Sequence, residues 1–165
     1  GLFILILLTS CEALKNDSFT QEYQYNLYAR SVINSDTTSR RVGPDSSVTV
    51  YTYHIDGGDS LVFEYERNLI PPENVMDAGL RETLVFGIPP RAESFELTDE
   101  KLLNANTFHG RSCFCPLAGA DYRVHSGSIE GEALSENIWF VKGSVNINGY
   151  AANYEVSFEN VFKLQ

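Results

Sequence analysis

The sequence has few basic residues. It contains 12 Lys and Arg against 22 Asp and Glu, which gives a formal net charge of −10. The charges are spread along the chain, and the one Arg-Arg pair, Arg40 and Arg41, lies in a polar segment. A surface of this sign repels phosphate backbones, so nucleic acid is excluded as a partner, and so is docking on anionic lipid through a basic face.

The sequence also lacks the motifs of common enzymes. No Gly-x-Ser-x-Gly elbow occurs, and acidic pairs such as Asp99 and Glu100 lie in polar segments where they are expected to be solvated. The segment Asp56–Asp59 places two aspartates beside two glycines, but a calcium ion needs six to eight oxygen ligands, so we expect a turn there. We therefore predict a protein that is not an enzyme and has no cofactor.

No apolar run reaches the roughly 20 residues that a helix needs to cross a bilayer. The one long run, Leu2–Leu8, is followed by Thr9, Ser10 and Cys11. This stretch resembles the lipobox of lipid-anchored envelope proteins, in which small residues precede a cysteine that is acylated and becomes the mature N-terminus. We expect residues 1–10 to be a lipoprotein signal peptide, truncated because neither Met nor a basic segment precedes the run, and Cys11 to carry the lipid.

Two other interpretations of this stretch stay open, namely an ordinary cleaved secretory signal and a buried element of the core. The polar residues that follow contain no turn that would return the run to a core, so residues 11–18 are expected to form a tether. Each buried methylene contributes about 0.8 kcal/mol, so several acyl chains on Cys11 would hold the protein on the membrane nearly permanently. The anchor would then be the only membrane contact.

Aromatic residues make up 12% of the chain, with nine Tyr and ten Phe. Together with β-branched residues and clusters of Gly, Asn, Asp and Pro, they are typical of strands joined by turns. The pattern predicts an all-β fold for residues 19–165, which we expect to be a single domain built as an antiparallel β-sandwich of about eight or nine strands. A lipocalin-like β-barrel is the alternative.

Individual elements follow from the same patterns. Period-two alternation predicts a strand over 19–33, with a helix starting at Ser18 as the rival, and breaker residues predict a loop over 34–47. Two Gly in the connection predict a hairpin between residues 48–55 and 61–65. The remaining expectations are a central strand buried on both faces (Glu82–Ile88), a short strand (Ser94–Leu97), a helical turn capped by Thr98 (98–103), and a closing hairpin in which odd positions of 139–147 and even positions of 154–164 face the core.

The chain has three cysteines. If Cys11 is acylated, Cys113 and Cys115 remain, and an oxidising compartment favours a disulfide between them. Residues i and i+2 of a strand lie roughly 6.6 Å apart, near the upper limit for a bridge, so a turn or bulge would have to bring them closer. Two free thiols, a redox-active pair, and a metal site formed with His109 and His125 stay open as alternatives.

Four features of the sequence belong together: the lipobox at Cys11, the Pro89-Pro90 pair after a strand, the Cys113-Phe114-Cys115 step, and the segment Gly127–Gly131 that leads to Trp139 and the closing strands. Together they resemble small uncharacterised envelope lipoproteins that are common in Bacteroidota. The resemblance implies a lipid-anchored β-sandwich at the outer membrane, facing either the periplasm or the surface, and it brings no catalytic residues.

We therefore expect a non-catalytic binding or interaction role in the cell envelope, with a glycan, a peptide or a protein as the ligand. Tyr residues supply rigid amphipathic contact surface for such a role. The alternatives are a structural or assembly subunit that pairs through an exposed edge strand, and a lipocalin-like carrier of a small apolar ligand.

Overall fold

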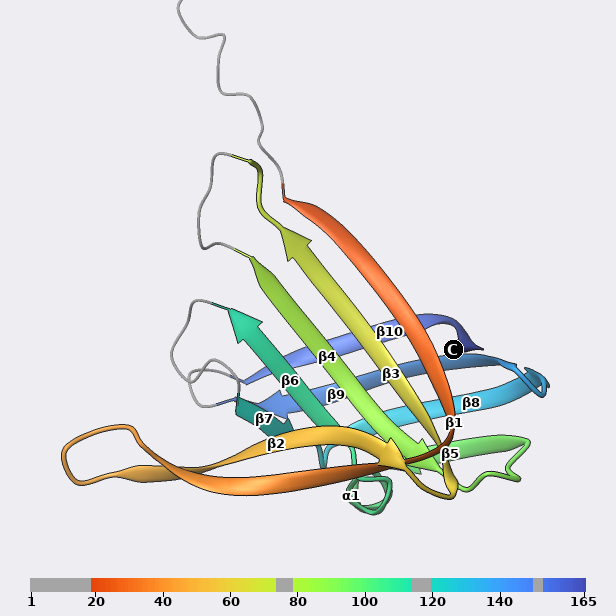
Figure 1. The fold of residues 1–165 in the computed structure, drawn as a ribbon, viewed down its shortest axis with the longest axis horizontal. Helices are drawn as coiled ribbons and strands as arrows, with labels where there is room; N and C mark the ends of the chain where they lie inside the picture. Colours follow the sequence, from red (N-terminus) through yellow and green to blue (C-terminus); the bar gives the residue numbers. More distant parts are fainter. Residues whose placement is uncertain (1–18, 74–78, 114–119, 150–152) are drawn as a thin grey trace, which may run out of the picture.

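The computed structural model describes residues 19–73, 79–113, 120–149 and 153–165. Within these ranges the chain forms ten strands and one short helix (Figure 1). In chain order they are β1 (Thr20–Arg41), β2 (Ser47–Gly57), β3 (Ser60–Ile70), β4 (Leu80–Ile88), β5 (Ser94–Thr98), α1 (Glu100–Asn104), β6 (Phe108–Cys113), β7 (Ala120–Arg123), β8 (Gly127–Ser135), β9 (Ile138–Asn148) and β10 (Asn153–Leu164).

The all-β prediction is confirmed, and six of the strands close into a small barrel. Around the barrel the order is β1, β2, β7, β6, β4, β3 and back to β1. Two strand pairs complete the ring: β1 pairs with β2 along its whole second half, and β2 meets β7 at a single pair, Tyr51 with Asp121. The ring closes at that one pair, and residues 32–41 of β1 pair only with β2, so this part of the two strands extends as an arm with a free edge.

A second layer continues from the barrel. β10 pairs with β1 in parallel, with Leu27 opposite Leu164, and β9, β8 and β5 follow in antiparallel order. Figure 1 shows β8, β9 and β10 crossing the direction of β3, β4 and β6 at a steep angle. The molecule is thus a six-stranded barrel with a sheet layered on one side, so the predicted sandwich and its barrel alternative each describe part of it.

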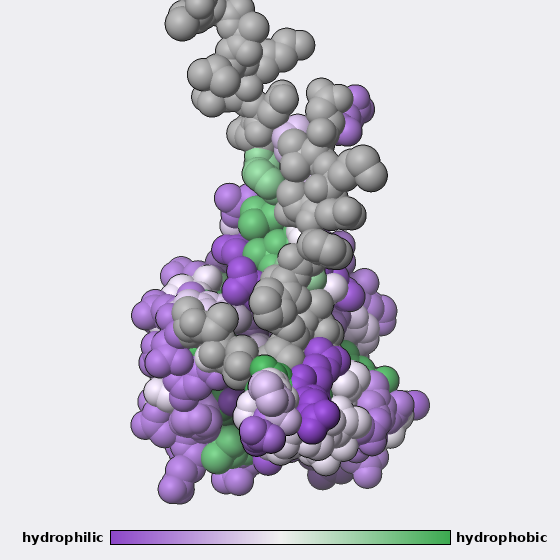
Figure 2. All heavy atoms as spheres, turned by 90° about the vertical axis from the view of Figure 1, so that its left-hand side faces the viewer, coloured by the Kyte–Doolittle hydropathy of each residue, from purple (hydrophilic) through white to green (hydrophobic). Residues whose placement is uncertain are grey.

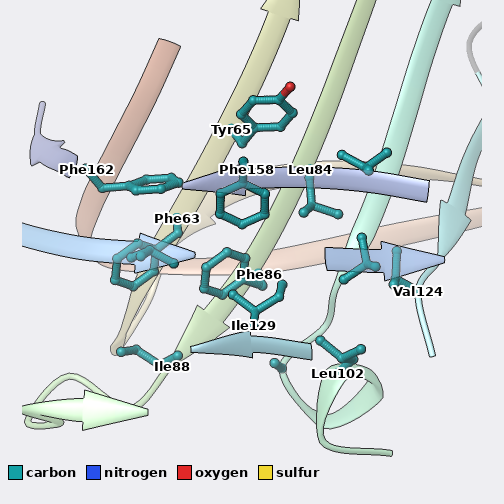
Figure 3. Packing of buried hydrophobic residues seen from close by; sticks show 14 of the residues in the cluster. Phe63, Tyr65, Leu84, Phe86, Ile88, Leu102, Val124, Ile129, Phe158 and Phe162 are labelled. Atoms are coloured by element: carbon teal, nitrogen blue, oxygen red, sulfur yellow. The ribbon is translucent and has the colours of Figure 1, made fainter. Parts of the chain in front are cut away.

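The main hydrophobic core lies between this second sheet and one face of β3 and β4. Figure 3 shows Phe63 and Phe86 pointing into the same cluster as Phe158 and Phe162. The rings of Phe63 and Phe86 are stacked with centroids 5.0 Å apart, and Trp139 meets Phe63 edge-on at 5.5 Å. Each large side chain buried in this way contributes about 1.5–3 kcal/mol, so the cluster is the main source of stability for both layers.

The other face of β3 and β4 lines the barrel interior. Ile33, Val62, Val85 and Phe108 form a small apolar cluster there. β4 is buried on both faces from Glu82 to Phe86, which confirms the predicted central strand. Because side chains alternate along a strand, every second residue of β3 and β4 belongs to the sandwich core and the others belong to the barrel.

The prediction of a loop over 34–47 is wrong for residues 34–41. β1 continues to Arg41 and pairs with β2 in an unbroken register from Ser31 opposite Gly57 to Arg41 opposite Ser47. The side chains of residues 34–39 are exposed, so this half of the strand shows no apolar alternation. Backbone hydrogen bonds and Thr residues, which favour extended conformations, hold it instead.

The predicted hairpin between β2 and β3 is also wrong. These strands do not pair with each other; β3 pairs with the first half of β1 and β2 with its second half. Between the halves the ladder breaks at Arg30, which has a φ of 51°, and the amide of Gly58 donates to the Arg30 carbonyl at 2.9 Å. The glycine-rich connection therefore turns a corner over this break in β1.

The predicted closing hairpin and the predicted helical turn are largely confirmed. In the closing hairpin Trp139 lies opposite Phe162 and most of the expected positions are buried, but Leu164 is exposed where β10 leaves β9 to pair with β1. The helical turn is present as α1, although its N-cap is Asp99 and not Thr98. In the described part of the chain, no helix has the length and apolar character required to cross a membrane.

The corner at Gly58 can be tested by a pair of neighbouring substitutions. A Cβ atom at Gly58 would lie 2.6 Å from Val32 Cβ, whereas a Cβ atom at Gly57 would meet nothing within 4 Å. We expect Gly58→Ala to lower the free energy of unfolding by about 1–3 kcal/mol through overpacking, and Gly57→Ala to leave it nearly unchanged. Urea denaturation of both variants measures the difference, and equal stabilities would contradict the tight corner.

Candidate ligand-binding pocket

A cavity of about 860 Å³ opens on the barrel side of the central strands. All six barrel strands contribute to its lining, because their alternate residues point inward. Its principal polar residues are Tyr28 from β1, Tyr53 from β2, Glu64 from β3, Thr83 from β4 and Asp121 from β7, with Gly110 of β6 between them.

A chain of hydrogen bonds joins these residues. Tyr28 Oη donates to Glu64 Oε2 at 2.8 Å, and Tyr53 Oη lies 3.0 Å from Thr83 Oγ1 and 3.5 Å from Glu64 Oε1. Asp121 Oδ2 accepts a hydrogen bond from the Tyr53 amide at 2.7 Å. The two tyrosines therefore hold both carboxylates in place, one through hydroxyl groups and the other through the backbone.

Gly110 allows these groups to approach each other. A Cβ atom at this position would lie 2.6 Å from both Asp121 Oδ1 and Thr83 Oγ1, so these two oxygens are separated by no more than twice that distance. A glycine inside a strand often marks such a close approach. Any larger residue would push the Asp121 and Thr83 side chains apart and fill part of the cavity.

Burial changes the acidity of the lining residues. It raises the pKa of the Asp121 carboxyl above its usual value, and it raises the pKa of Tyr53. Burial and the hydrogen bond to Glu64 raise the pKa of Tyr28 to about 12, so this phenol stays protonated and remains a hydrogen-bond donor at neutral pH.

Beside the cavity, Arg81 is paired with a different carboxylate. Its Nη2 atom donates to Glu66 Oε2, and Asn68 donates to the other oxygen of Glu66 at 2.6 Å. Burial alone would raise the pKa of Glu66, but these two hydrogen bonds lower it overall. Arg81 therefore has Glu66 as its ion-pair partner at the rim of the pocket, and Glu64 acts on it from a longer distance.

The site residues expected from the sequence lie elsewhere. Cys11 and Cys115 fall outside the described residues, so lipidation of Cys11 and the Cys113–Cys115 pairing stay predictions, although Cys113 is disulfide-bonded. His109 is fully buried in β6, whereas His125 is exposed and contacts Asn148. Among the described residues no three His, Cys, Asp or Glu side chains converge as metal ligands would.

His109 instead belongs to a buried polar row on the sandwich face of the sheet. Its Nε2 atom lies 3.2 Å from Glu82 Oε1, and its Nδ1 atom lies 3.3 Å from Tyr154 Oη. Arg67 Nε lies 3.2 Å from the other oxygen of Glu82. The contacts of Glu82 with His109 Nε2 and Arg67 Nε have ion-pair distances without hydrogen-bond alignment, so we treat them as charge interactions.

The residues of this buried row have a structural role. Burial alone would raise the pKa of Glu82, but His109 and Arg67 lower it below its usual value, so the carboxylate is ionised at neutral pH. Burial, together with the Glu82 charge, raises the pKa of Tyr154 to about 12, which leaves its hydroxyl protonated and poorly nucleophilic. The row links β3, β4 and β6 to β10, and hence one layer to the other.

The sequence analysis placed residues 61–65 in a strand but gave no role to the carboxylates of that strand. Glu64 and Glu66 alternate with Phe63 and Tyr65 in β3, and carboxylates are rarely buried in such runs without a specific role. That pattern, and Gly110 within a strand, were the available signals. Which strands would meet around the cavity depends on long-range pairing, for which the sequence gives no local sign.

On the surface, most of the face shown in Figure 2 is hydrophilic, and apolar residues gather in a narrow band that extends above the main body. The exposed large apolar residues of the described chain include Phe19, Tyr23 and Ile70. Thr20 pairs with Ile70, so these residues lie together at the end of β1 and β3 that follows the predicted tether.

The buried row predicts a pH-dependent stability. Glu82→Gln should lower the free energy of unfolding by about 1–3 kcal/mol at pH 7, because Arg67 and His109 lose the carboxylate that they contact. Since the pKa of Glu82 is lower in the folded protein than in the unfolded chain, its contribution is complete above about pH 4.3 and is lost as the pH falls through the folded-state value.

Urea denaturation of wild type and Glu82→Gln at pH 7 and at pH 3 measures this loss. The exposed Glu136 provides the matched control, and Glu136→Gln should change stability by less than about 0.5 kcal/mol at either pH. A difference between wild type and Glu82→Gln that stays constant or grows on acidification would contradict the assignment.

No protein-family model, no curated protein and no solved structure matches this chain.

Proposed function

We propose that the protein is a lipid-anchored, non-catalytic binding protein of the cell envelope, and that the barrel pocket holds a polar ligand. The ligand is a small molecule or the polar end of a peptide or glycan. The observation that carries this proposal is the 860 Å³ cavity whose lining combines fixed tyrosine hydroxyls with the carboxylates of Glu64 and Asp121. Pockets of this size with a few fixed polar groups are typical ligand sites.

The lining favours a polar ligand over an apolar one. Glu64, Asp121 and Asp56 all border the cavity, and an apolar occupant would remove their carboxylates from water without offering hydrogen bonds in return. The apolar residues of the barrel interior, including Val62 and Phe108, pack against one another. A lipocalin-like carrier of an apolar ligand is therefore the weaker candidate.

Two features support an anchor on the membrane. The sequence around Cys11 has the pattern of a lipobox, and the seven residues Glu12–Ser18 can span about 25 Å at most before the first strand. The strand ends reached by this tether carry the exposed side chains of Phe19, Tyr23 and Ile70. An apolar end close to the bilayer is compatible with an anchored protein, and the disulfide at Cys113 supports an oxidising compartment.

A structural or assembly role would need an accessible strand edge. In the described sheet two edges are accessible: β5, which is only five residues long with Ser94 and Glu96 exposed, and residues 34–41 of β1, which pair only with β2 and carry mostly exposed polar or charged side chains. Short and charged edge strands are poor templates for pairing with another chain. The pocket is therefore the stronger basis for function.

The anchor predicts incorporation of fatty acid at one residue. When cells that express the full-length protein are grown with labelled palmitate, the wild-type protein should carry label and Cys11→Ala should carry none, because acylation requires the thiol. Cys113→Ala is the control and should remain labelled. Label in Cys11→Ala, or its absence from wild type, would contradict the proposal.

The pocket predicts that ligand binding depends on the space beside Gly110. A panel of an amine, a neutral sugar and a carboxylate (putrescine, N-acetylglucosamine and succinate) can be titrated into the ¹⁵N-labelled protein. At least one probe should shift the amide resonances of Tyr53 and Gly110, and Gly110→Ala should weaken that probe about tenfold or more because it displaces Asp121 and Thr83.

Gly79 provides the matched control because a Cβ atom there would make only ordinary contacts, the closest at 3.7 Å. Gly79→Ala should bind the probe as the wild type does. If no probe shifts the pocket resonances, or if Gly110→Ala and Gly79→Ala bind equally well, the pocket is not the ligand site.

A further inference from the structure

Three carboxylates border the pocket, and among the described residues only Asp56 has an ion-pair contact, to His54 at 3.2 Å, whereas Glu64 and Asp121 have none. Glu64 is 9% exposed, and its oxygens contact only the hydroxyls of Tyr28 and Tyr53. Asp121 uses Oδ2 for the Tyr53 amide, while Oδ1 faces the gap at Gly110. Within the described part of the chain, no Lys, Arg or His nitrogen lies within ion-pair distance of either group.

The two arginines that border the cavity are engaged elsewhere. Arg81 is bound to Glu66, whose second oxygen is held by Asn68. The guanidinium of Arg111 lies over the ring of Tyr154, 5.4 Å from its centroid, on the sandwich side of the sheet. Arg81 therefore acts on Glu64 only from beyond ion-pair distance, and three carboxylates against two guanidinium groups leave the lining with a net negative charge.

The groups around Glu64 and Asp121 are arranged to accept hydrogen bonds from a cationic ligand. Tyr28 and Thr83 fix the positions of the surrounding oxygens, so a ligand meets acceptors that are already ordered. The ring of Tyr53 is stacked on Phe108 with centroids 6.2 Å apart, which holds its hydroxyl between Glu64 and Thr83. An ammonium group has three donors and no acceptor, which matches this set of oxygens.

We infer that the pocket selects ligands that carry a primary ammonium group, which binds the carboxylates of Glu64 and Asp121. This inference rests on the proposed function and names its ligand class. A hydroxyl-rich neutral ligand could use the same oxygens, but it would leave the two negative charges uncompensated, whereas an ammonium group makes charge-assisted hydrogen bonds to them. A free amine and the lysine side chain of a peptide share this chemistry.

The experiment compares putrescine with its neutral isostere 1,4-butanediol by calorimetry on the full-length protein in detergent. Putrescine should bind and the diol should not. Glu64→Gln and Asp121→Asn keep the size of each side chain and one acceptor oxygen, and each should weaken putrescine about 10- to 100-fold. The control variant is Glu136→Gln, which removes an exposed carboxylate that does not line the pocket. This variant should bind putrescine as the wild type does.

A second arm identifies the source of the amine. Acetyl-Gly-Lys-Gly-amide is compared with the same peptide acetylated on the lysine nitrogen; tighter binding of the unmodified peptide than of putrescine supports a peptide ligand, and the reverse order supports a free amine. Thermal unfolding of each variant confirms that it is folded. Equal binding of the diol and putrescine, or unchanged affinity in both Glu64→Gln and Asp121→Asn, overturns the ammonium preference.

The failures of the two proposals can be told apart. If N-acetylglucosamine or succinate binds and is weakened by Gly110→Ala while putrescine does not bind, the pocket remains the ligand site and only the ammonium preference is overturned. If no probe depends on Gly110, both proposals are overturned.

Discussion

The structure depends on one constraint, the burial of β3 and β4 on both faces. Their alternate side chains serve two different interiors, so Phe63 and Phe86 anchor the second sheet while Glu64 and Thr83 face the barrel. Neither face can be rearranged alone, because a shift of one residue would exchange the two sets. The apolar core between the layers thus fixes the positions of the polar groups behind it, and it supplies the rigid frame that a ligand site needs.

The buried carboxylates on the two faces of the central strands differ in their charge partners. On the sandwich face, Glu82 is balanced by Arg67 and His109, so its charge is compensated within the fold. On the barrel face, Glu64 is held by the hydroxyls of tyrosines and has no cation within ion-pair distance in the described chain. Burying a carboxylate without a cation within ion-pair distance is costly, and proteins keep such groups mainly at functional sites. This contrast separates the structural row from the pocket.

Local patterns in the sequence were sufficient for the elements whose burial is regular. The alternation around Trp139 and Phe158 predicted the closing hairpin, and the apolar run before Pro89 predicted a central strand. The second half of β1 was missed because its side chains are exposed, and β2 and β3 were paired wrongly because the break at Arg30 depends on the tertiary structure. The pocket could not be predicted for the same reason: Tyr28, Glu64 and Asp121 come from strands that meet only when the barrel closes.

The central claim is that Glu64 and Asp121, which have no ion-pair contact among the described residues, receive a cationic ligand inside the barrel. It is tested most directly by ¹³C NMR of the side-chain carboxyl carbons during a titration with putrescine. The account predicts that the resonances of Glu64 and Asp121 move together along one saturable curve, while those of Glu82, which is already paired, and the exposed Glu136 stay in place. Shifts that are confined to exposed carboxylates, or that never saturate, would contradict it.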